Sequence, residues 1–354
     1  MFVNLSKNLI DDLILAFHVI AMFLHVIFNQ PDTLTPLILL LAILVINIYT
    51  EPLILISGFK WHPQNLVKNL IIWFDLKLNR DNRSSLDRLI RGGLTLLIIL
   101  FLSSLFGYSI AWLSQNIRFA WILEALLLHT FIDQCGIYKK ILIIYKLLKT
   151  NDLASARQII FSISSEPMDK VDSYIIARSA IELLATSLII RVIAPVFWYV
   201  LFGAIGIVIY HSINIINHRI GHNITRYRDF GFATRHLNTA LLFFPSLITG
   251  HLIVIASLFI PKATPIKSYK SMVKYTRKYH KTNLGFAISA FAGALGLALA
   301  GPKTFNKKTM RTPWIGDGSA MVTHNDIRRS LYLSAIVCLF NGLLVATIIL
   351  TQQG

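Results

Sequence analysis

Long apolar runs separated by basic, polar stretches form the main pattern of this chain. Three of the runs are at least 20 residues long and contain no Lys, Arg, Asp or Glu: Leu94–Leu113, Asn238–Ile260 and Leu331–Leu350. An α-helix crosses the hydrocarbon core of a bilayer with about 20 consecutive, mostly apolar residues. These runs therefore predict membrane-spanning helices.

Other apolar runs are shorter or interrupted. Leu13–Phe28 follows two aspartates and precedes no small-residue cleavage site, so we expect a retained segment and no cleaved signal peptide. Pro36–Tyr49 is a second short run, and Phe119–Thr130 is predicted to return after Leu94–Leu113. Ile181–Ile216 is too long for one span, and Pro195, Gly203 and Gly206 interrupt it. It predicts a hairpin or a bent pair of helices.

Leu284–Ala300 is rich in Gly and Ala and has a basic segment on each side, Lys262–Lys281 and Lys303–Arg329. Positively charged loops remain on the cytoplasmic side of a membrane. Two basic flanks on one side favour a tightly packed or re-entrant segment over a simple crossing.

The fold class that follows is an all-α, polytopic, helical integral membrane protein with basic cytoplasmic loops and roughly six to eight membrane segments. We expect an extra N-terminal membrane segment at 1–35 and a main membrane domain at 36–354. A polar helical insertion is predicted at 139–178, where Asn151-Asp152-Leu153 has the residue types that begin a helix.

Composition supports this class. The 354 residues are 55% hydrophobic and 14% charged, whereas soluble domains have about 25% charged residues. The net charge of +17 fits basic loops against anionic membrane lipid, and it also fits a site for anionic, phosphorylated ligands. Nucleic acid is not an expected partner, because the Lys and Arg residues lie between membrane segments. Cys135 and Cys338 form neither a disulfide framework nor a metal-ligand spacing.

Two polar clusters are candidates for chemistry. Arg226–Gly231 follows Gly221 and Asn223, and Asp229 in it is interpreted either as a local ion-pair partner or as a group that orients phosphate-binding arginines. In Pro313–Gly318 the glycines let backbone N–H groups approach a ligand. There Asp317 is a candidate for binding Mg²⁺ or for ending the turn.

Single carboxylates leave alternatives open. Glu182 is either a charge at a helix N-terminus or a metal or acid–base group in a wet cavity. Asp326 is expected to cap the helix before Leu331. The chain contains no Walker A, GxSxG, HExxH or GxGxxG motif.

The order of several motifs resembles the membrane proteins of cobalamin biosynthesis known as adenosylcobinamide-phosphate synthases, the CobD/CbiB family. The resemblance runs from about Leu37 to about Leu333. The motifs are Glu51-Pro52, Trp61-His62-Pro63, Leu78-Asn79-Arg80, Asn151-Asp152-Leu153, Ala177–Glu182, Ala194–Trp198, Asn214, Gly221, Asn223, Arg226–Gly231, Asn283, Gly285, Ala292–Gly296, Gly301-Pro302 and Pro313–Gly318.

This resemblance implies a reaction and a set of site residues. The family joins cobyric acid, a corrinoid, to an aminopropanol phosphate through an amide bond, with ATP and Mg²⁺ as the expected activating system in the bacterial inner membrane. The implied catalytic residues are Glu182, Asp229 and Asp317, and Glu182 and Asp317 are also the implied metal ligands. The implied phosphate- and substrate-binding residues are Asn223, Arg226, Arg228, Asn283, Trp314, Gly316 and Gly318.

The chain departs from the family pattern at acidic positions. Thr186–Arg191 stands where the family has an acidic run, and Glu166-Pro167-Met168 stands where it has Arg-Asp-Thr. Acids of the family are also replaced within Ile215–Arg219 and Asn238-Thr239. Fewer carboxylates make a poorer Mg²⁺ site. Two hypotheses follow. One is a divergent synthase, in which Glu182, Asp229 and Asp317 converge on one pocket. The other is a non-catalytic membrane regulator or scaffold, similar to the AmpE-like signalling modulators.

Overall fold

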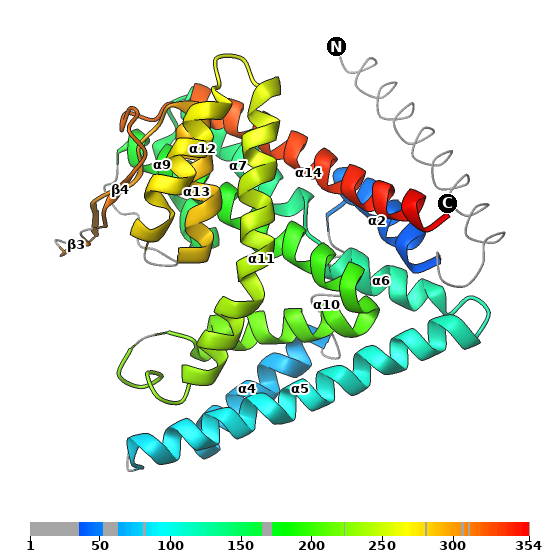
Figure 1. The fold of residues 1–354 in the computed structure, drawn as a ribbon. Helices are drawn as coiled ribbons and strands as arrows, with labels where there is room; N and C mark the ends of the chain where they lie inside the picture. Colours follow the sequence, from blue (N-terminus) through cyan, green and yellow to red (C-terminus); the bar gives the residue numbers. More distant parts are fainter. Residues whose placement is uncertain are drawn as a thin grey trace.

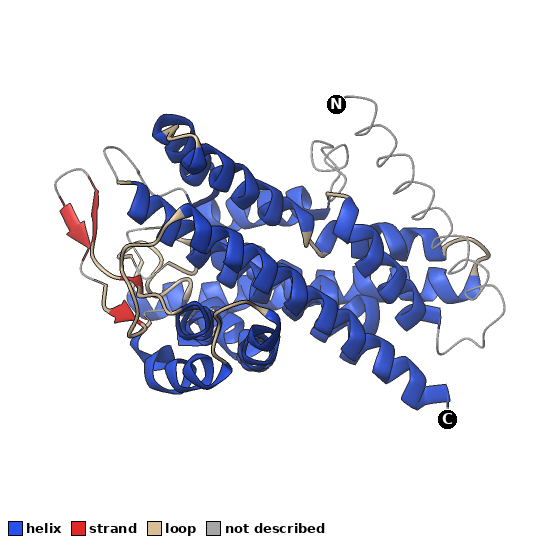
Figure 2. Ribbon diagram, turned by 90° about the horizontal axis from the view of Figure 1, so that it is seen from above, coloured by secondary structure: helices blue, strands red, loops and turns tan. Residues whose placement is uncertain are grey.

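The described part of the chain is almost entirely helical in the computed structural model (Figures 1 and 2). The structure describes residues 35–51, 63–80, 83–164, 172–222, 224–279, 282–305, 308–310 and 312–353. The apolar run Leu13–Phe28, the dipeptide Trp61-His62, the tripeptide Glu166–Met168 and Asn223 lie outside the described residues.

The helices, with the π-helical and 3₁₀ turns named η, are α2 (Thr35–Tyr49), α4 (Pro63–Leu78), α5 (Ser85–Asn116), α6 (Trp121–Phe131), α7 (Cys135–Lys149), α8 (Leu153–Ser164), α9 (Ser173–Ser187), η1 (Leu188–Ile193), α10 (Ala194–Ile220), α11 (Phe232–Ala256), η2 (Ser257–Phe259), α12 (Pro265–Tyr275), η3 (Thr276–Lys278), α13 (Thr282–Leu295) and α14 (His324–Gln353). The strands are β1 (Leu299–Ala300), β2 (Lys303–Phe305), β3 (Lys308–Met310) and β4 (Trp314–Ile315). β1 pairs antiparallel with β4, and β2 with β3.

Four helical stretches of the described chain are long and apolar enough to cross a membrane: Ser85–Asn116, Ser173–Ile220, Phe232–Phe259 and His324–Thr351. Two shorter apolar helices are Pro36–Tyr49 and Asn283–Leu295. The three predicted uninterrupted spans lie in the first, third and fourth stretches. The protein is thus a helical integral membrane protein, and the number of crossings stays a prediction.

The outer surface of α5 is apolar and exposed. Leu97, Phe101 and Leu105 are each more than half exposed. Exposed apolar surface of this extent is typical of contact with lipid or with another protein. Its inner face contains Gly92 and Gly107, where α5 packs against neighbouring backbone.

The predicted break in Ile181–Ile216 is confirmed at Gly203, where the helical backbone is interrupted inside α10. The helix runs from α9 through η1 into α10, and Pro195 lies at the start of α10. Gly203 then has φ 59° and ψ −148°, a conformation that only glycine adopts readily. Figure 1 shows α10 changing direction in its course. At Gly206 a Cβ atom would lie 2.2 Å from the carbonyl oxygen of Trp198, which explains a glycine just after the bend.

The largest apolar cluster joins α7, α8 and α9 to α11, α12, α13 and α14. The predicted polar helical section 139–178 corresponds to most of α7, all of α8 and the start of α9, and Ile141, Ile144 and Ile160 are fully buried in the cluster. Its helical character is confirmed, and the domain limits stay a prediction. Asp152 accepts a hydrogen bond from the Ser155 N–H at 3.1 Å, which confirms the predicted start of α8.

α13 is as tightly packed as its Gly and Ala content predicts. Ala287, Ala290 and Phe291 are completely buried. A Cβ atom at Gly285 or Gly293 would lie 2.4 Å from a backbone carbonyl oxygen of η3 or α12, respectively. Only glycine allows this approach.

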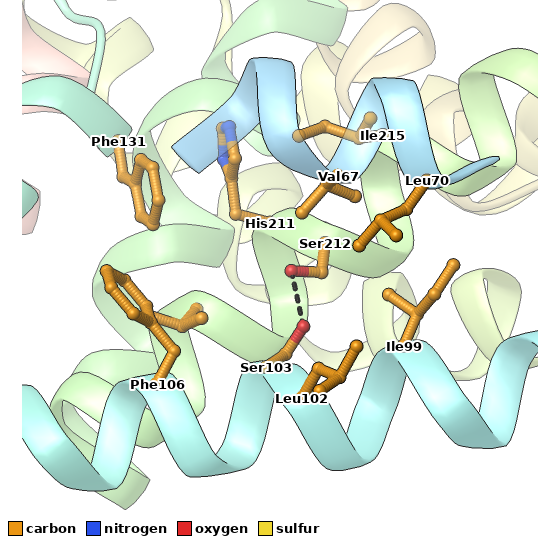
Figure 3. A pocket seen from close by; sticks show the side chains of 11 residues that line it. Val67, Leu70, Ile99, Leu102, Ser103, Phe106, Phe131, His211, Ser212 and Ile215 are labelled. Carbon is orange, nitrogen blue, oxygen red and sulfur yellow. Dashed lines mark hydrogen bonds between the residues drawn. The ribbon is translucent and has the colours of Figure 1, made fainter. Parts of the chain in front are cut away.

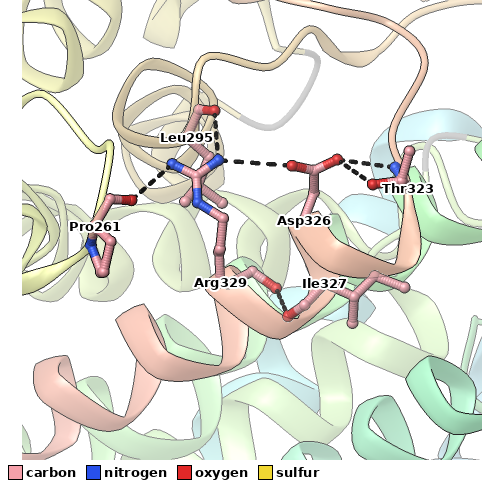
Figure 4. A network of polar contacts seen from close by, with 7 residues as sticks. Pro261, Leu295, Thr323, Asp326, Ile327 and Arg329 are labelled. Carbon is pink, nitrogen blue, oxygen red and sulfur yellow. Dashed lines mark hydrogen bonds and ion pairs between the residues drawn. The ribbon is translucent and has the colours of Figure 1, made fainter.

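At the start of α14, the side chain of Asp326 reaches back to Thr323 (Figure 4). Asp326 Oδ2 accepts hydrogen bonds from both the N–H and the hydroxyl of Thr323, each at 2.9 Å. A side chain that reaches back to the residue before the helix satisfies an otherwise unpaired N–H group. The predicted cap by Asp326 is confirmed. Arg329 lies 3.6 Å from Asp326 and donates to the carbonyls of Leu295 and Pro261 at 3.4 and 3.3 Å.

Candidate functional site

Glu182 is a buried carboxylate in the middle of α9. Its Oε1 accepts a hydrogen bond from the Ala300 N–H at 2.8 Å, and the residue is 7% exposed. Because α9 begins at Ser173, the interpretation of Glu182 as a charge at a helix N-terminus is wrong, since that effect is confined to the first turn. The carboxylate instead fixes the backbone of β1 against α9.

One helical turn before Glu182, Arg178 completes the same face of α9. Its guanidinium carbon lies 4.7 Å from the centre of the Trp314 ring, and Nη2 lies 3.5 Å from the carbonyl oxygen of Pro302. Arg178 is 4% exposed, whereas Trp314 is 40% exposed. A guanidinium over an aromatic face is an attractive cation–π contact. Trp314, predicted to bind substrate, thus covers one face of a buried cation.

The backbone between Glu182 and Trp314 is unusual. Ala300 and Gly301 have successive positive φ values of 56° and 74°, and Ala300 pairs with Trp314 across the β1–β4 bridge. A non-glycine residue rarely adopts positive φ, and such strain is often found at functional sites. A Cβ atom at Gly301 would lie 2.6 Å from the Trp314 ring, so this position also requires glycine.

Asp317 lies on the exposed side of the same segment. Lys274 Nζ contacts its two carboxylate oxygens at 3.0 and 3.1 Å, and the Tyr275 hydroxyl donates to Oδ1. The hydrogen bond from Tyr275, followed by that from Lys274, lowers the pKa of Asp317 below its usual value. With a lysine already on both oxygens, Asp317 connects the turn to α12.

The two glycines beside Asp317 pack against backbone. Gly316 has φ 102°, and a Cβ atom there would lie 2.2 Å from the Leu297 carbonyl oxygen. At Gly318 the corresponding distance to the Gly296 carbonyl oxygen is 2.0 Å. The Ser319 N–H donates to that same carbonyl at 3.0 Å. These contacts hold the turn 313–319 against the end of α13.

The remaining predicted binding residues have structural partners. Asn283 is buried in α13 and donates to the Thr239 carbonyl of α11. Arg226 lies 3.6 Å from Asp75, and its side chain is 47% exposed. Arg228 accepts a hydrogen bond from Arg235 at its carbonyl oxygen. Asn223 lies outside the described residues.

Asp229 pairs with Arg88 of α5 at 3.6 Å, and not with its neighbouring arginines as the local ion-pair interpretation expected. Beside it, Asp75 of α4 accepts hydrogen bonds from Tyr227 at 2.9 Å and from Asn79 at 3.0 Å. Asp75 is 4% exposed. It is the sole carboxylate of helix α4, and that isolation was the sequence signal for it.

These contacts assemble the predicted residues into two groups. Glu182, Trp314, Gly316, Asp317 and Gly318 belong to the first group, built from α9, α12 and the segment 296–319. Asp229 and Arg226 belong to the second group, which binds the loop before α11 to α4 and α5. In Figure 1 that loop lies at the opposite end of α11 from α12 and β4.

The carboxylates of the described residues do not form a magnesium cage. Within those residues, no three His, Cys, Asp or Glu side chains lie close enough together to hold a metal ion. Glu182 is tied to a backbone N–H and Asp317 to a lysine. The donor set therefore does not fit a Mg²⁺ ion held by protein ligands alone.

An apolar pocket of about 170 Å³ lies between α4, α5 and α10 (Figure 3). Leu70, Ile99 and Phe106 are among its lining residues. Its two serine side chains form a hydrogen bond with each other, in which Ser103 donates to Ser212 at 2.8 Å. His211 stacks on Phe131 with a ring separation of 4.1 Å. This lining suits an apolar group and offers little to a phosphate.

Comparison with known proteins decides the family. A family model described as "CobD/Cbib protein" matches residues 39–334. The chain belongs to the CobD/Cbib family. The resemblance placed between Leu37 and Leu333 is confirmed, and the match covers every helix from α4 to α13.

Curated CobD relatives match over most of their length. "Cobalamin biosynthesis protein CobD" of Sinorhizobium sp is 30% identical over 299 residues, which cover 82% of this chain and 91% of the relative. The protein of the same name from Brucella suis biovar 1 (strain 1330) is 29% identical over 315 residues, covering 88% and 96%. That of Halalkalibacterium halodurans is 30% identical over 278 residues, covering 77% and 85%. No solved structure matches the chain.

Within this CobD/Cbib chain, motifs far apart in sequence meet in the first group. Arg178 of the motif Ala177–Glu182 contacts Pro302 and Trp314, and Glu182 contacts the neighbouring Ala300. Arg178 was missed as a site residue by sequence reasoning, although its spacing of four from Glu182 places the two on one helix face.

Proposed function

We propose that this chain is a cobinamide-phosphate synthase, which joins a carboxyl group of cobyric acid to the amine of an aminopropanol phosphate in cobalamin biosynthesis. Its CobD/Cbib membership and the names of its relatives, cobalamin biosynthesis proteins, support the pathway. The meeting of α9 with the segments 299–302 and 313–318 at Glu182 and Arg178 is the observation that carries the proposal.

The chemistry requires activation, because a carboxylate is a poor electrophile for an amine. In the proposed reaction a carboxylate oxygen of cobyric acid attacks the γ-phosphorus of ATP, and ADP leaves. The amine then attacks the carbonyl carbon of the acyl phosphate, loses a proton, and inorganic phosphate leaves as the amide forms. Glu182 is the proposed acceptor of that proton, since it is a carboxylate buried beside the meeting motifs.

The protein's own residues would bind and orient the substrates in this scheme. The described carboxylates do not fit a protein-held Mg²⁺, and Mg²⁺ in ATP-dependent enzymes is held largely by substrate phosphates. We therefore do not assign Asp317 as a magnesium ligand, because Lys274 contacts both of its carboxylate oxygens. Asp317 is proposed to hold the 313–319 turn in place.

We place the protein in the bacterial inner membrane with its basic loops in the cytoplasm. The net charge of +17 supports that orientation through the preference of Lys- and Arg-rich loops for the cytoplasmic side. ATP is available there. The corrinoid and the aminopropanol phosphate would reach the site from the same side.

A second candidate is a non-catalytic regulator or scaffold, similar to the AmpE-like proteins. The observation that favours it is Arg191, which stands in the run where the family has acids. Arg191 pairs with Asp133 at 2.8 Å, and its carbonyl accepts the Asp133 N–H at 3.0 Å. The replaced position thus has a structural contact of its own.

Complementation separates the two candidates. The chain is expressed in a strain lacking its own cobinamide-phosphate synthase, cobyric acid is supplied, and cobalamin-dependent growth is scored. A synthase restores growth, and Glu182→Gln abolishes it while Asp317→Asn only weakens it, because Asp317 is assigned a structural role. Protein that reaches the membrane folded and yet supports no growth contradicts the proposal and favours the regulator.

A further inference from the structure

Arg178 has more hydrogen-bond donors than partners. It is 4% exposed, its Nε is buried without a hydrogen-bond partner, and Nη2 reaches the Pro302 carbonyl only at 3.5 Å. A guanidinium carries five N–H donors and is always charged. Burying such a group with unmet donors is unfavourable unless a ligand completes it.

The surroundings of Arg178 direct a ligand to the edge of the guanidinium. Trp314 covers one face at 4.7 Å. Pro302 and Trp314 are both exposed, so Arg178 lies one layer of side chains below the surface. The plane of the guanidinium is where its N–H groups point, and a planar fork of donors matches the oxygens of a phosphate.

By contrast, Arg226 and Arg228 are poor candidates for the phosphate site. Arg226 already pairs with Asp75 and is half exposed. Both belong to the group at the other end of α11, away from Glu182. An exposed and paired arginine offers less to an anion than a buried one with unmet donors.

Glu182 next to Arg178 narrows the ligand class. The two residues are four apart on α9, a spacing that places side chains about 5–6 Å apart on one face. An amino-alcohol phosphate at neutral pH carries an ammonium group and a phosphate ester, and a two-carbon chain joins them. A cation and an anion one helical turn apart are complementary to such a zwitterion.

We propose that Arg178 binds the phosphate group of the amino-alcohol phosphate substrate, with Glu182 facing its amine. This inference rests on the proposed synthase function and assigns one substrate to one end of that site. If Arg178 instead bound ATP, its substitution would weaken the affinity for ATP and leave the affinity for the amino-alcohol phosphate unchanged.

The test uses full-length protein in nanodiscs with cobyric acid, Mg-ATP and either aminopropanol phosphate or aminopropanol. Wild type should strongly prefer the phosphorylated amine. Arg178→Gln should raise the KM for aminopropanol phosphate by about 10- to 100-fold and abolish the preference, with little change in the KM values for ATP and cobyric acid. Arg178→Lys should recover part of the affinity, because it keeps the charge and loses the fork.

Arg328→Gln is the matched control, because Arg328 lies on the exposed start of α14 over Tyr332 and outside both groups. It should leave all KM values unchanged. A rise in the KM for ATP or cobyric acid alone, or an unchanged preference for the phosphorylated amine in Arg178→Gln, overturns the inference.

Equilibrium dialysis with labelled aminopropanol phosphate gives a readout that needs no turnover. Wild type should bind the ligand, and Arg178→Lys should bind it more weakly while melting at a similar temperature. If wild type binds the ligand but forms no product, the result contradicts the proposed synthase function and still supports the phosphate site at Arg178. If wild type turns over while Arg178→Lys and Arg178→Gln both bind as wild type does, the site fails and the function stands.

Discussion

At the residue scale, the charged side chains of this protein differ in how completely their partners satisfy them. Arg226, Arg88 and Lys274 each lie near a carboxylate. Arg178, one helical turn from Glu182, has instead a buried Nε without a hydrogen-bond partner, an indole ring over one face and a carbonyl oxygen at 3.5 Å. Ion pairs near the surface contribute little to stability, so their presence points to local structure. Arg88 Nε is also buried without a hydrogen-bond partner, but Arg88 pairs with Asp229, whereas Arg178 lies where the motifs on α9, at Pro302 and at Trp314 meet.

Asp317 is predicted to stabilise the folded protein at neutral pH and to lose that effect in acid. Its pKa in the folded state is lowered by the hydrogen bonds from Tyr275 and Lys274, so it binds a proton more weakly when folded than when unfolded. The contribution is present above the unfolded pKa of about 3.9 and is lost as pH falls through the folded pKa. It is small because the pair is exposed.

Thermal melting in detergent at neutral pH and at about pH 3 measures this effect. The melting temperature of wild type should fall more on acidification than that of Asp317→Asn, which has no carboxylate to protonate. Asp87→Asn, at an exposed carboxylate in the first turn of α5, serves as the control and should follow wild type. Equal losses in wild type and Asp317→Asn would contradict the assigned role.

Sequence reasoning could identify important residue types but not their partners. The motif Ala177–Glu182 drew attention to Glu182, yet its hydrogen-bond donor is the backbone of Ala300, far along the chain. No periodicity relates residues at such separation. The same holds for Asp229, whose partner Arg88 lies on another helix. Local ion pairing was the nearest available interpretation, and tertiary structure replaced it.

At the scale of elements, the pattern of apolar runs predicted the long helices well, because length and hydropathy determine what can cross a bilayer. The glycines at the break in 181–216 predicted a change of direction. The sequence alone could not decide between a hairpin and a bend. How far the chain turns at Gly203 depends on the packing of α10 against α5, in which Gly107 lies against the backbone of Ile205.

Gly107→Ala is predicted to weaken the contact between α5 and α10. An added Cβ atom would lie 2.7 Å from the Ile205 Cα and 3.1 Å from the Ala204 carbonyl oxygen. Backbone atoms cannot move aside cheaply, so the free energy of unfolding should fall by about 1–3 kcal/mol. Thermal or denaturant unfolding of the purified protein measures the change.

Gly93→Ala is a control within the same helix, since no atom lies within 4 Å of the position its Cβ would occupy. That substitution should be neutral or slightly stabilising, because alanine favours helix more than glycine does. Similar losses in both variants would mean that helix propensity, and not the approach of α10, determines the effect.

At the scale of the whole molecule, the two flanks of α13 are predicted to share the cytoplasmic side. Lys274 of α12 contacts Asp317, so α12 and the segment 313–319 lie together. Single cysteines at exposed Lys270 and Met321 should resist a membrane-impermeant maleimide in intact spheroplasts and react once the membrane is opened. The native Cys135 and Cys338 are replaced by alanine in this background.

The variant that lacks both native cysteines and carries no added cysteine is the control. It should stay unlabelled before and after the membrane is opened. Labelling of position 270 or 321 before the membrane is opened would contradict the assigned orientation.

The family and the helical membrane architecture could thus be predicted from the sequence, because both depend on patterns that run along the chain. The arrangement of the site could not. A single pocket holding Glu182, Asp229 and Asp317 was one hypothesis, and the described contacts instead assign Asp229 to the group on α4 and α5. That division arises from the length of α11, which separates the loop before it from the segments after it.

The contacts of Arg329 have a consequence for the order of synthesis. Its guanidinium joins Pro261, which follows α11 and η2, to Leu295 at the end of α13 and to Asp326. The ribosome adds Arg329 after all the segments that form the first group. A nascent chain therefore already contains α9, α13 and the strands β1 and β4 before Arg329 is added. The Arg329 side chain joins Pro261 to Leu295. The contacts that join Pro261 to Leu295 can therefore form only after the start of α14 has been synthesised.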